Sequence, residues 1–229
     1  MSSPAQPSDL KEPTRLNPLN KLESSSQPSQ DKPDKAKAIL AGALQVFTTQ
    51  GYAAASMDRI ASAAGVSKPT LYRYFQDKEG LFIALTRELT QKRSRAILKL
   101  LSEPNFQIPP DKVLHQIATV ILGEFSQNQQ LMTLMRLIIG ESERFPELAQ
   151  TFVREIKKPI LERLACYLES QPQLKLPDPM VAARIFVGSL VHYLLVQNIM
   201  HGSEILPLER DRLVNGLIHL MTDADKTQL

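Results

Sequence analysis

The stretch AGVSKPTLYRYF, residues 64–75, constrains the fold more than any other part of the sequence. Gly65 can adopt the left-handed backbone that a tight turn between two helices requires. Ser67 can accept the first backbone hydrogen bond of a following helix, and Pro69 falls in its first turn, where a missing N–H removes no helical bond. The spacing therefore predicts a turn at Gly65 followed by a short helix over 68–75.

The residues before the turn predict a partner helix over 57–63, with Ser56 as its N-cap. Two helices that cross closely need a small side chain at their contact, and Ala61 lies four residues before the turn glycine. The apolar residues of the segment then fall on inward positions: Ile60, Ala64, Val66, Leu71 and Phe75. Together these features predict a helix-turn-helix.

The remaining side chains of 67–74 point outward in such a motif, and they are aromatic and cationic. Lys68 and Arg73 can contact phosphates or guanine, and Thr70 can touch a base edge or a thymine methyl group. Tyrosine hydroxyls can donate to phosphate oxygens. Cations or polar groups beside helix N-termini add candidate phosphate contacts. On these grounds the candidate DNA-contacting residues are Ser56, Lys68, Thr70, Tyr72, Arg73, Tyr74 and Lys78.

Two alternatives stay open for this segment. One tyrosine could pack into the core, which would leave only Lys68 and Arg73 exposed, and Ser56 could serve as a cap alone. The charge distribution favours a polyanion-binding surface, because residues 34–95 carry ten Lys and Arg against five Asp and Glu. The net charge of the whole chain is only +3, so a lysine-rich solvated surface would also account for this excess.

The chain divides by composition into three parts. Residues 1–33 are rich in Pro, Ser and Gln without a periodic apolar face, which predicts a disordered arm. Residues 34–93 form the expected helix-turn-helix domain, with a helix over 34–50 capped by Asp34 and stopped at Gly51. Residues 94–229 form a larger helical domain. The fold class is all-α, and the further expected helices are a fourth running from Asp77 to about 101, then 111–126, 128–141, 146–170, 179–201 and 207–222.

The runs SMDRIASAAGVSKPTLYRYFQDKEGLFIAL and AILAGALQVFTTQGY resemble the DNA-binding domain of TetR-family transcriptional regulators, over about residues 35–90. The resemblance implies a homodimer whose third helices enter the major grooves of a palindromic operator. It adds Pro69 to the candidate DNA contacts, at a position where members often carry a smaller side chain. Tyr74 stands where many members have His. The later run LMRLIIGESERFPELAQTFVREIKKPILERLACYL resembles the helical domain of multidrug and stress regulators.

The helix expected over 179–201 is apolar nearly all round, and such a helix usually contacts both its own core and a partner. Together with the helix over 207–222 it predicts a four-helix dimer bundle. The candidate interface residues are Val187, Leu190, Val191, Leu194, Leu213, Leu217 and Leu220. A monomer with a thick core is the alternative. The most apolar stretch, Ile185 to Met200, is expected to be too short and too polar to span a membrane.

The resemblance also implies a pocket for a small hydrophobic or amphipathic effector in the second domain. The candidate walls are Phe125, Met132, Met135, Phe152, Phe186 and Tyr193. The candidate polar anchors are His115, Arg136 and His192. Each of these residues could instead be an ordinary core residue, because Met and aromatic residues at helical spacing usually are.

Other functions find little support in the sequence. The four histidines are scattered, and no phosphate loop, nucleophile elbow or metal-ligand spacing occurs, so we expect no enzyme, cofactor or metal. Cys166 is the single cysteine, and its apolar neighbours suggest burial. The expected protein is a cytoplasmic, homodimeric repressor that binds operator DNA and is released by an effector. An activator, an effector-independent regulator and a helical protein-binding module are the alternatives.

Overall fold

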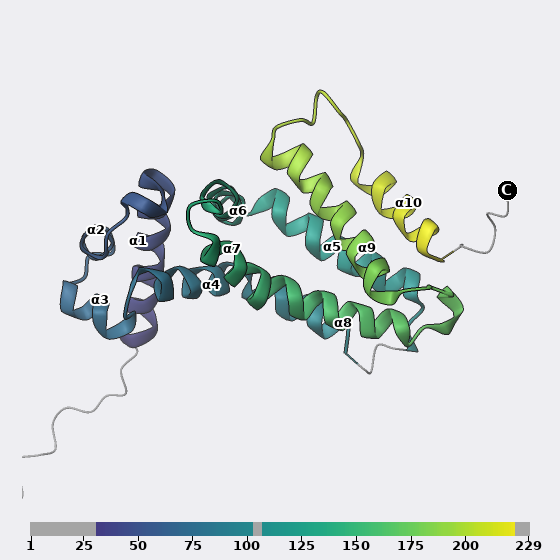
Figure 1. Ribbon diagram of the computed structural model, residues 1–229, viewed down its shortest axis with the longest axis horizontal. Helices are drawn as coiled ribbons and strands as arrows, with labels where there is room; N and C mark the ends of the chain where they lie inside the picture. Colours follow the sequence, from purple (N-terminus) through teal and green to yellow (C-terminus); the bar gives the residue numbers. More distant parts are fainter. Residues whose placement is uncertain (1–30, 103–106, 223–229) are drawn as a thin grey trace, which may run out of the picture.

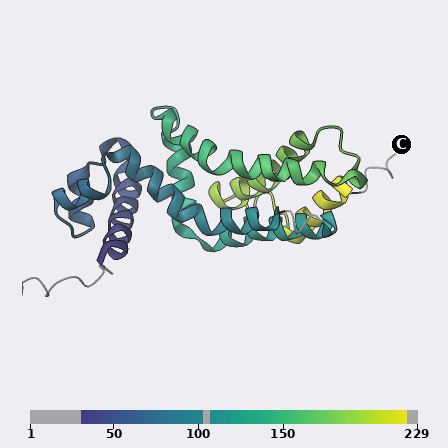
Figure 2. The same cartoon turned by 90° about the horizontal axis from the view of Figure 1, so that it is seen from below.

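The computed structural model describes residues 31–102 and 107–222, and all regular structure within these ranges is helical, as predicted. Figure 1 shows a small head joined to an elongated body by one long helix, α4 (Lys78–Leu100). The view from below shows the same arrangement (Figure 2). The head consists of α1 (Asp31–Ala54), α2 (Met57–Ala63) and α3 (Lys68–Tyr74).

The helices of the body are α5 (Pro110–Gln127), α6 (Gln129–Glu141), α7 (Pro146–Phe152), α8 (Lys158–Glu169), α9 (Pro179–Leu194) and α10 (Arg210–Thr222). Helices α5, α8, α9 and α10 pack around one apolar core that the second half of α4 also enters. Helix α8 lies along α9, and α5 contacts α4, α9 and α10. Tyr167 and Phe186 are among the largest fully buried side chains of this core.

Two expected helix starts are wrong. Helix α1 begins at Asp31, so Asp34 lies in its first turn and is not the N-cap. Pro33 permits the earlier start, because a first-turn residue needs no hydrogen-bonded N–H. Helix α10 begins at Arg210 and not at 207. The predicted stop at Gly51 is confirmed, since its φ of 77° breaks the helical path. Of the arm predicted over 1–33, residues 1–30 lie outside the described residues.

The helix predicted over 146–170 contains a π-helical turn, Val153–Lys157, between α7 and α8. Pro159 lies two residues after this turn, and a proline in a helical run removes the hydrogen bond to the carbonyl four residues before it. A π turn inserts one extra residue and changes which side chains face inward. A second π turn, Leu195–Ile199, continues α9.

A second apolar core joins the head to the body. It contains most of the buried side chains of α1 to α3, and it also takes in Leu131, Leu134 and Ile138 of α6 and Leu148 of α7. The boundary expected near residue 93 therefore separates two segments that share a core. Helices α6 and α7 therefore pack directly against the head.

The helical stretch Pro179–Ile199 ends two residues before the predicted 179–201, and its 21 residues correct the expectation that this region is too short and too polar to span a membrane. Among the residues that the structure describes, it is the one helix long and apolar enough to cross a membrane by length and composition. Its inner face is nevertheless part of the body core, where Ala183, Phe186 and Leu190 are fully buried. One face of this helix is therefore packed in the body core, and much of the rest is exposed in the single subunit.

Candidate nucleic-acid interface

The segment from Ser56 to Phe75 folds as the predicted helix-turn-helix. The Ser56 hydroxyl accepts from the Arg59 N–H at 3.3 Å and caps α2, and the Ser67 hydroxyl accepts from the Thr70 N–H at 3.3 Å and caps α3. Gly65 has a φ of 65°, which a residue with a Cβ adopts only at a cost. The expected inward residues Ile60, Ala61 and Leu71 are buried.

Helix α1 holds this motif through a very close approach at Gly42. A Cβ built on Gly42 would lie 2.7 Å from the backbone nitrogen of Ala64 and 2.9 Å from its Cβ. The atoms in the way belong to the end of α2 beside the turn, so they cannot swing aside as a flexible side chain could. Gly42 therefore fixes the distance between α1 and the helix-turn-helix.

Replacing Gly42 with alanine should destabilise the protein by about 1–3 kcal/mol, the usual cost of overpacking a core. Urea unfolding followed by circular dichroism measures the change. Gly140→Ala is the matched control, because a Cβ there would meet no atom within 4 Å. The control should be neutral or slightly stabilising, since alanine favours a helix over glycine. Equal stabilities for the two variants would contradict the close approach.

The outward face of α3 carries the expected cationic and aromatic side chains. Lys68, Pro69 and Arg73 are exposed, and Tyr72 is 45% exposed. Thr70 is half-buried, and its hydroxyl lies 2.8 Å from that of Ser67. The alternative of an inward tyrosine is correct for Tyr74 alone, which is half-buried and packs against the second core.

Two cations of this face have partners within the head. The Lys68 ammonium lies 2.8 Å from an Asp58 carboxylate oxygen, and this hydrogen bond and charge raise the pKa of Lys68. The Arg73 guanidinium lies 5.6 Å from the centre of the Tyr74 ring. Exposed ion pairs contribute little to stability, so Lys68 can exchange Asp58 for a phosphate at small cost.

Arg59 is a further cation near this face that the sequence interpretation missed. Its guanidinium donates to the Gln50 side-chain oxygen at 2.6 Å and to the Ala54 carbonyl at 3.4 Å. The residue is exposed and lies in the first turn of α2, beside the Ser56 cap. Arg59 lies three residues after the predicted N-cap Ser56, and this spacing could have placed it at the same end of α2 as the other candidate phosphate contacts.

Lys78 makes contacts that differ from the expected phosphate clamp. Its ammonium donates to the carbonyls of Tyr52 at 2.8 Å, Ala55 at 3.1 Å and Ala53 at 3.4 Å, and it lies 4.4 Å from the centre of the Tyr52 ring. Burial lowers the pKa of Lys78, while Glu141 opposes this shift. The side chain thus ties the start of α4 to residues 52–55, which follow the kink of α1 at Gly51 and are called here the loop before α2.

Replacing Lys78 with methionine should lower the free energy of unfolding by about 1–2 kcal/mol, because three loop carbonyls lose a charged donor. Urea unfolding tests this, with the exposed Lys112→Met as the control. A phosphate clamp would behave differently. In that case stability would stay unchanged, and the salt dependence of DNA binding would fall by about one charge per subunit.

The loop before α2 is also held by the end of α6. The Glu141 carboxylate accepts from the Tyr52 N–H at 3.0 Å. The Tyr52 ring packs edge-on against Phe145 of the body at 5.0 Å and against Phe82 of α4 at 5.5 Å between centroids. Glu141 was not among the predicted residues, because a contact 89 positions away leaves no local sequence signal.

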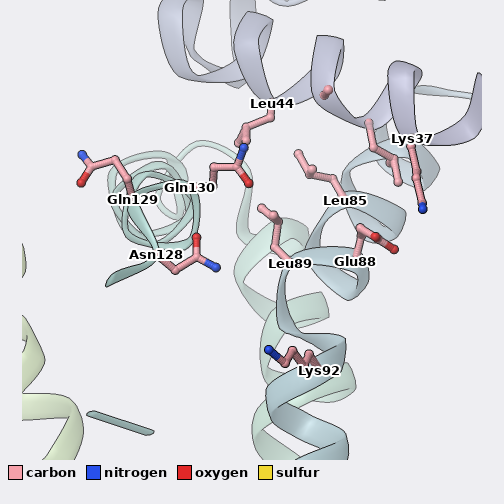
Figure 3. Close-up of a pocket in the computed structure, with 11 residues that line it drawn as sticks. Lys37, Leu44, Leu85, Glu88, Leu89, Lys92, Asn128, Gln129 and Gln130 are labelled. Atoms are coloured by element: carbon pink, nitrogen blue, oxygen red, sulfur yellow. The ribbon is translucent and has the colours of Figure 1, made fainter. Parts of the chain in front are cut away.

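A groove separates the head from the body at the start of α6. This groove of about 810 Å³ lies between α1, α4 and the start of α6 (Figure 3). Its lining includes Leu44, Leu85 and Leu89 together with Lys37 and Lys92. The head is therefore packed against the body at the Glu141 contact, and a groove lies between them at the start of α6.

The nine residues predicted for an effector pocket do not line one cavity. Phe186 is fully buried in the body core, and Met135 belongs to the second core. Arg136 donates to the Asn198 carbonyl at 3.0 Å, and His192 is exposed. Met132 is buried, Tyr193 packs partly buried against the body core, His115 lies in an open depression between α5 and α10, and the Phe125 side chain lies outside the described residues.

An enclosed cavity of about 50 Å³ does lie inside the body, and Phe152 is the only residue predicted for the effector pocket among its described lining. Val187 and Val191, which were predicted for the dimer interface, also line it. It is bounded by α4, α5, α6, α8, α9 and the π turn after α7. Its described lining is apolar apart from a few side chains of α4 and Lys157, and consists of Thr90, Arg93, Ser94, Ile97, Ile121, Leu131, Phe152, Ile156, Lys157, Ile160, Leu161, Val187 and Val191.

The expected dimer residues are mostly inward, which corrects that prediction. Val187, Leu190, Leu194 and Leu217 are buried in the core of their own subunit, and Leu213 packs against it. Only Val191 and Leu220 are exposed, at 37% and 75%. Helices α8 and α5 cover one side of α9. Because α9 is apolar nearly all round, the sequence could not show which of its sides faces the core.

The exposed apolar residues of α9 and α10 lie on different positions from those predicted. Val181 and Ile185 are 48% and 57% exposed, and Gly188 continues this face of α9. Gly216 and Leu220 form a similar face on α10. A Cβ on either glycine would meet no atom within 4 Å, so both backbones are accessible to a partner.

Cys166 is exposed, so the expectation of burial is wrong. Its neighbours Leu164, Ala165 and Tyr167 are buried, but the helical turn of α8 directs Cys166 to the opposite side.

Comparisons with known proteins agree with this architecture. Residues 39–85 match the model for bacterial regulatory proteins of the tetR family, and residues 112–224 match the C-terminal domain of AefR-like transcriptional repressors. The uncharacterized HTH-type transcriptional regulator YhgD of Bacillus subtilis is 27% identical over 194 residues, which cover 82% of this chain and 94% of YhgD.

Solved structures give the same result. The flavonoid-responsive regulator FrrA is 29% identical with a TM-score of 0.64, covering 84% of this chain and 97% of FrrA. The regulator FadR from Bacillus subtilis, in complex with stearoyl-CoA, shares the fold at 22% identity with a TM-score of 0.60, covering 81% and 97%. With both of its halves matched by family models and its helix-turn-helix formed as described, the chain belongs to the TetR family of transcriptional regulators.

Proposed function

We propose that this chain is a homodimeric, sequence-specific repressor that a small effector releases from operator DNA. TetR-family regulators are soluble DNA-binding proteins, usually repressors, and are generally not enzymes. The observation that carries the proposal is the outward face of α3, where Lys68, Tyr72 and Arg73 are exposed on a complete helix-turn-helix. The protein would act in the cytoplasm, where its operator lies.

In this proposal α3 enters the major groove. Arg73 and Lys68 supply cations for guanine or phosphate, and Tyr72 supplies a hydroxyl for phosphate. Ser56, Thr70 and Pro69 border the same surface, and the Tyr74 hydroxyl adds a contact at its edge. We assign Lys78 a supporting role, because its ammonium is already held by three carbonyls of the loop before α2.

The dimer is proposed to form through the exposed faces of α9 and α10. Val181, Ile185 and Leu220 would otherwise leave a large apolar surface in water. Gly188 and Gly216 allow the helices of two subunits to approach closely. A second copy of the same chain is the natural occupant, because a two-fold axis places the same patch on both sides of the interface. Two heads joined in this way reach two half-sites of a palindrome.

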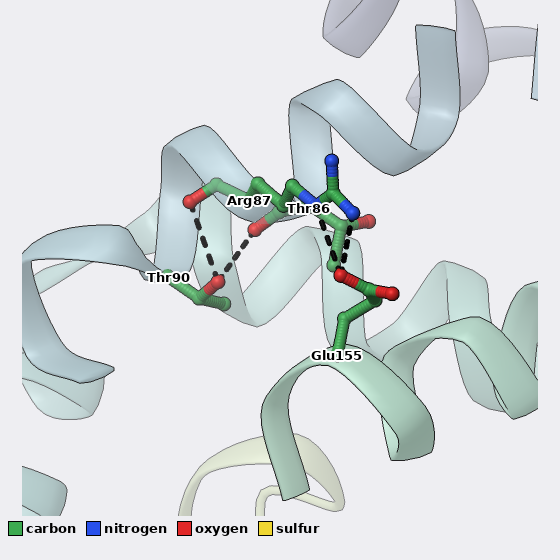
Figure 4. Close-up of polar contacts among 4 residues, drawn as sticks. All are labelled: Thr86, Arg87, Thr90 and Glu155. Atoms are coloured by element: carbon green, nitrogen blue, oxygen red, sulfur yellow. Dashed lines mark hydrogen bonds and ion pairs between the residues drawn. The ribbon is translucent and has the colours of Figure 1, made fainter. Parts of the chain in front are cut away.

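The release step is proposed to run through α4, which begins beside the helix-turn-helix and lines the enclosed cavity farther along. Thr90 of α4 lines the cavity, and its hydroxyl donates to the Thr86 carbonyl at 2.7 Å. One turn away, the Arg87 Nε donates to a Glu155 carboxylate oxygen at 3.1 Å and ties α4 to the π turn (Figure 4). A ligand that moves the π turn would therefore move α4 and rotate the head about its Glu141 contact.

The kind of effector follows from the cavity lining, which is mainly aliphatic. The similar structures FrrA, described as flavonoid-responsive, and FadR, solved with stearoyl-CoA, are regulators associated with large apolar or amphipathic molecules. We propose an amphipathic effector for this chain as well.

The test is binding of the purified protein to the intergenic DNA upstream of its own gene, with scrambled DNA as control, at two salt concentrations. Selective and salt-dependent binding with a palindromic footprint is the expected result. Binding of equal strength to both DNAs would contradict an operator in this region.

A further inference from the structure

The enclosed cavity carries two cationic side chains on otherwise mostly aliphatic walls. Arg93 comes from the middle of α4, and Lys157 is the last residue of the π turn. Arg93 is 6% exposed, and Lys157 is half-buried. The two charges lie near enough for Arg93 to lower the pKa of Lys157, after the larger effect of burial. Among the described residues that line the cavity there is no Asp or Glu.

The partners of Lys157 differ from those of its neighbour in the sequence. Lys158 is exposed and lies 3.6 Å from the Glu162 carboxylate. The Lys157 ammonium instead lies 5.7 Å from the centre of the Phe152 ring, and the described part of the chain gives it no carboxylate. A lysine ammonium removed from water is unfavourable unless an anion joins it.

The π turn explains how a lysine comes to be there. Val153 is 55% exposed and Arg154 is exposed, whereas Ile156 and Lys157 line the cavity. The extra residue of the π turn rotates the helix, and π turns of this kind are often found at functional sites. The π turn is also tied to α4 through Glu155 and Arg87. A group bound by Lys157 would therefore act directly on the helix that carries the head.

We propose that the cavity binds an organic monocarboxylate, whose carboxylate lies against Lys157 and Arg93 and whose apolar part lies against Ile121, Leu131 and Val187. The role of this ligand as an effector rests on the proposed function, whereas its binding to the cavity does not. A cavity of about 50 Å³ holds only a few water molecules, so the ligand must widen it as it enters. This widening would displace the π turn, and with it α4.

The first test measures binding without DNA. Thermal melting and calorimetry are performed with hexanoate, octanoate and phenylpropanoate, each paired with its neutral alcohol. At least one carboxylate should raise the melting temperature of the natural protein, and its alcohol should bind at least about tenfold more weakly, because a charge-assisted hydrogen bond is lost. Lys157→Met should weaken the carboxylate about tenfold or more and leave the alcohol unchanged.

Lys158→Met is the matched control, since it removes the adjacent but exposed lysine. It should bind the carboxylates as the natural protein does. Without ligand, Lys157→Met should melt at the same or a higher temperature, because a desolvated cation beside Arg93 is removed. A purely structural lysine would instead lower the melting temperature when replaced.

The proposal is overturned if no carboxylate binds, if the alcohols bind equally well, or if Lys157→Met retains the preference for the carboxylate. A separate arm adds the best carboxylate to the protein–operator complex. If the carboxylate releases the natural protein from DNA but not the Lys157→Met variant, this site is the effector site of the proposed function. Binding without release would leave the carboxylate site intact and would contradict only the effector step.

Discussion

Replacing Arg73 with alanine should weaken operator binding by about tenfold to a hundredfold for each half-site, since a good contact between an arginine and a base is worth about 1–3 kcal/mol. Arg73 is exposed on α3, and its described contact within the chain is the stacking over the Tyr74 ring. The substitution should therefore leave the melting temperature nearly unchanged. Fluorescence anisotropy with the selected operator measures the affinity.

Arg95→Ala is the matched control, because Arg95 is also exposed but lies on α4 in the body. It should bind the operator as the natural protein does. The specificity should change as well: if Arg73 contacts a guanine, the variant should discriminate less at one position of each half-site. Unchanged affinity and unchanged sequence preference in the variant would remove Arg73 from the interface.

Replacing Ile185 or Leu220 with glutamate should convert the proposed dimer to monomers. Both side chains are exposed in the subunit, at 57% and 75%. A two-fold interface would bury both copies of each side chain, one from each subunit. A carboxylate buried without a partner opposes association strongly, so the dissociation constant of the dimer should rise by about a hundredfold or more. Sedimentation equilibrium measures this constant.

Ile139→Glu controls for a charge placed on an exposed isoleucine, because Ile139 is 55% exposed on α6, away from α9 and α10. It should remain dimeric. The monomeric variants should lose most of their operator affinity, since a single head contacts only one half-site. If Ile185→Glu and Leu220→Glu both stay dimeric, the interface lies elsewhere on the body.

The parts of the fold that the sequence predicted well depend on interactions over a few residues. The caps at Ser56, Ser67 and Asp77 each bond a backbone N–H three residues ahead, so a short window contains all the information. The stops at Gly51 and Gly65 follow from positive φ angles that favour glycine.

The parts that could not be predicted depend on distant contacts. The sequence predicts Lys78 to be a surface cation, because its hydrogen bond to the Tyr52 carbonyl joins residues 26 positions apart. Helix α9 is apolar on most sides, so its periodicity could not show that Leu190 faces inward and Ile185 outward. Lys157 lies in a charged stretch, and only the π turn before Pro159 directs it toward the cavity.

The most direct test of a homodimeric, sequence-specific regulator is a selection from random-sequence DNA with the purified full-length protein, followed by footprinting of the enriched sites. We expect one enriched palindrome, with half-sites in successive major grooves about one helical turn apart. We also expect two subunits bound per palindrome, and weaker enrichment with less discrimination at one position of each half-site for Arg73→Ala. A pool that stays random after repeated rounds, or an enriched site without two-fold symmetry, would contradict a homodimeric sequence-specific regulator.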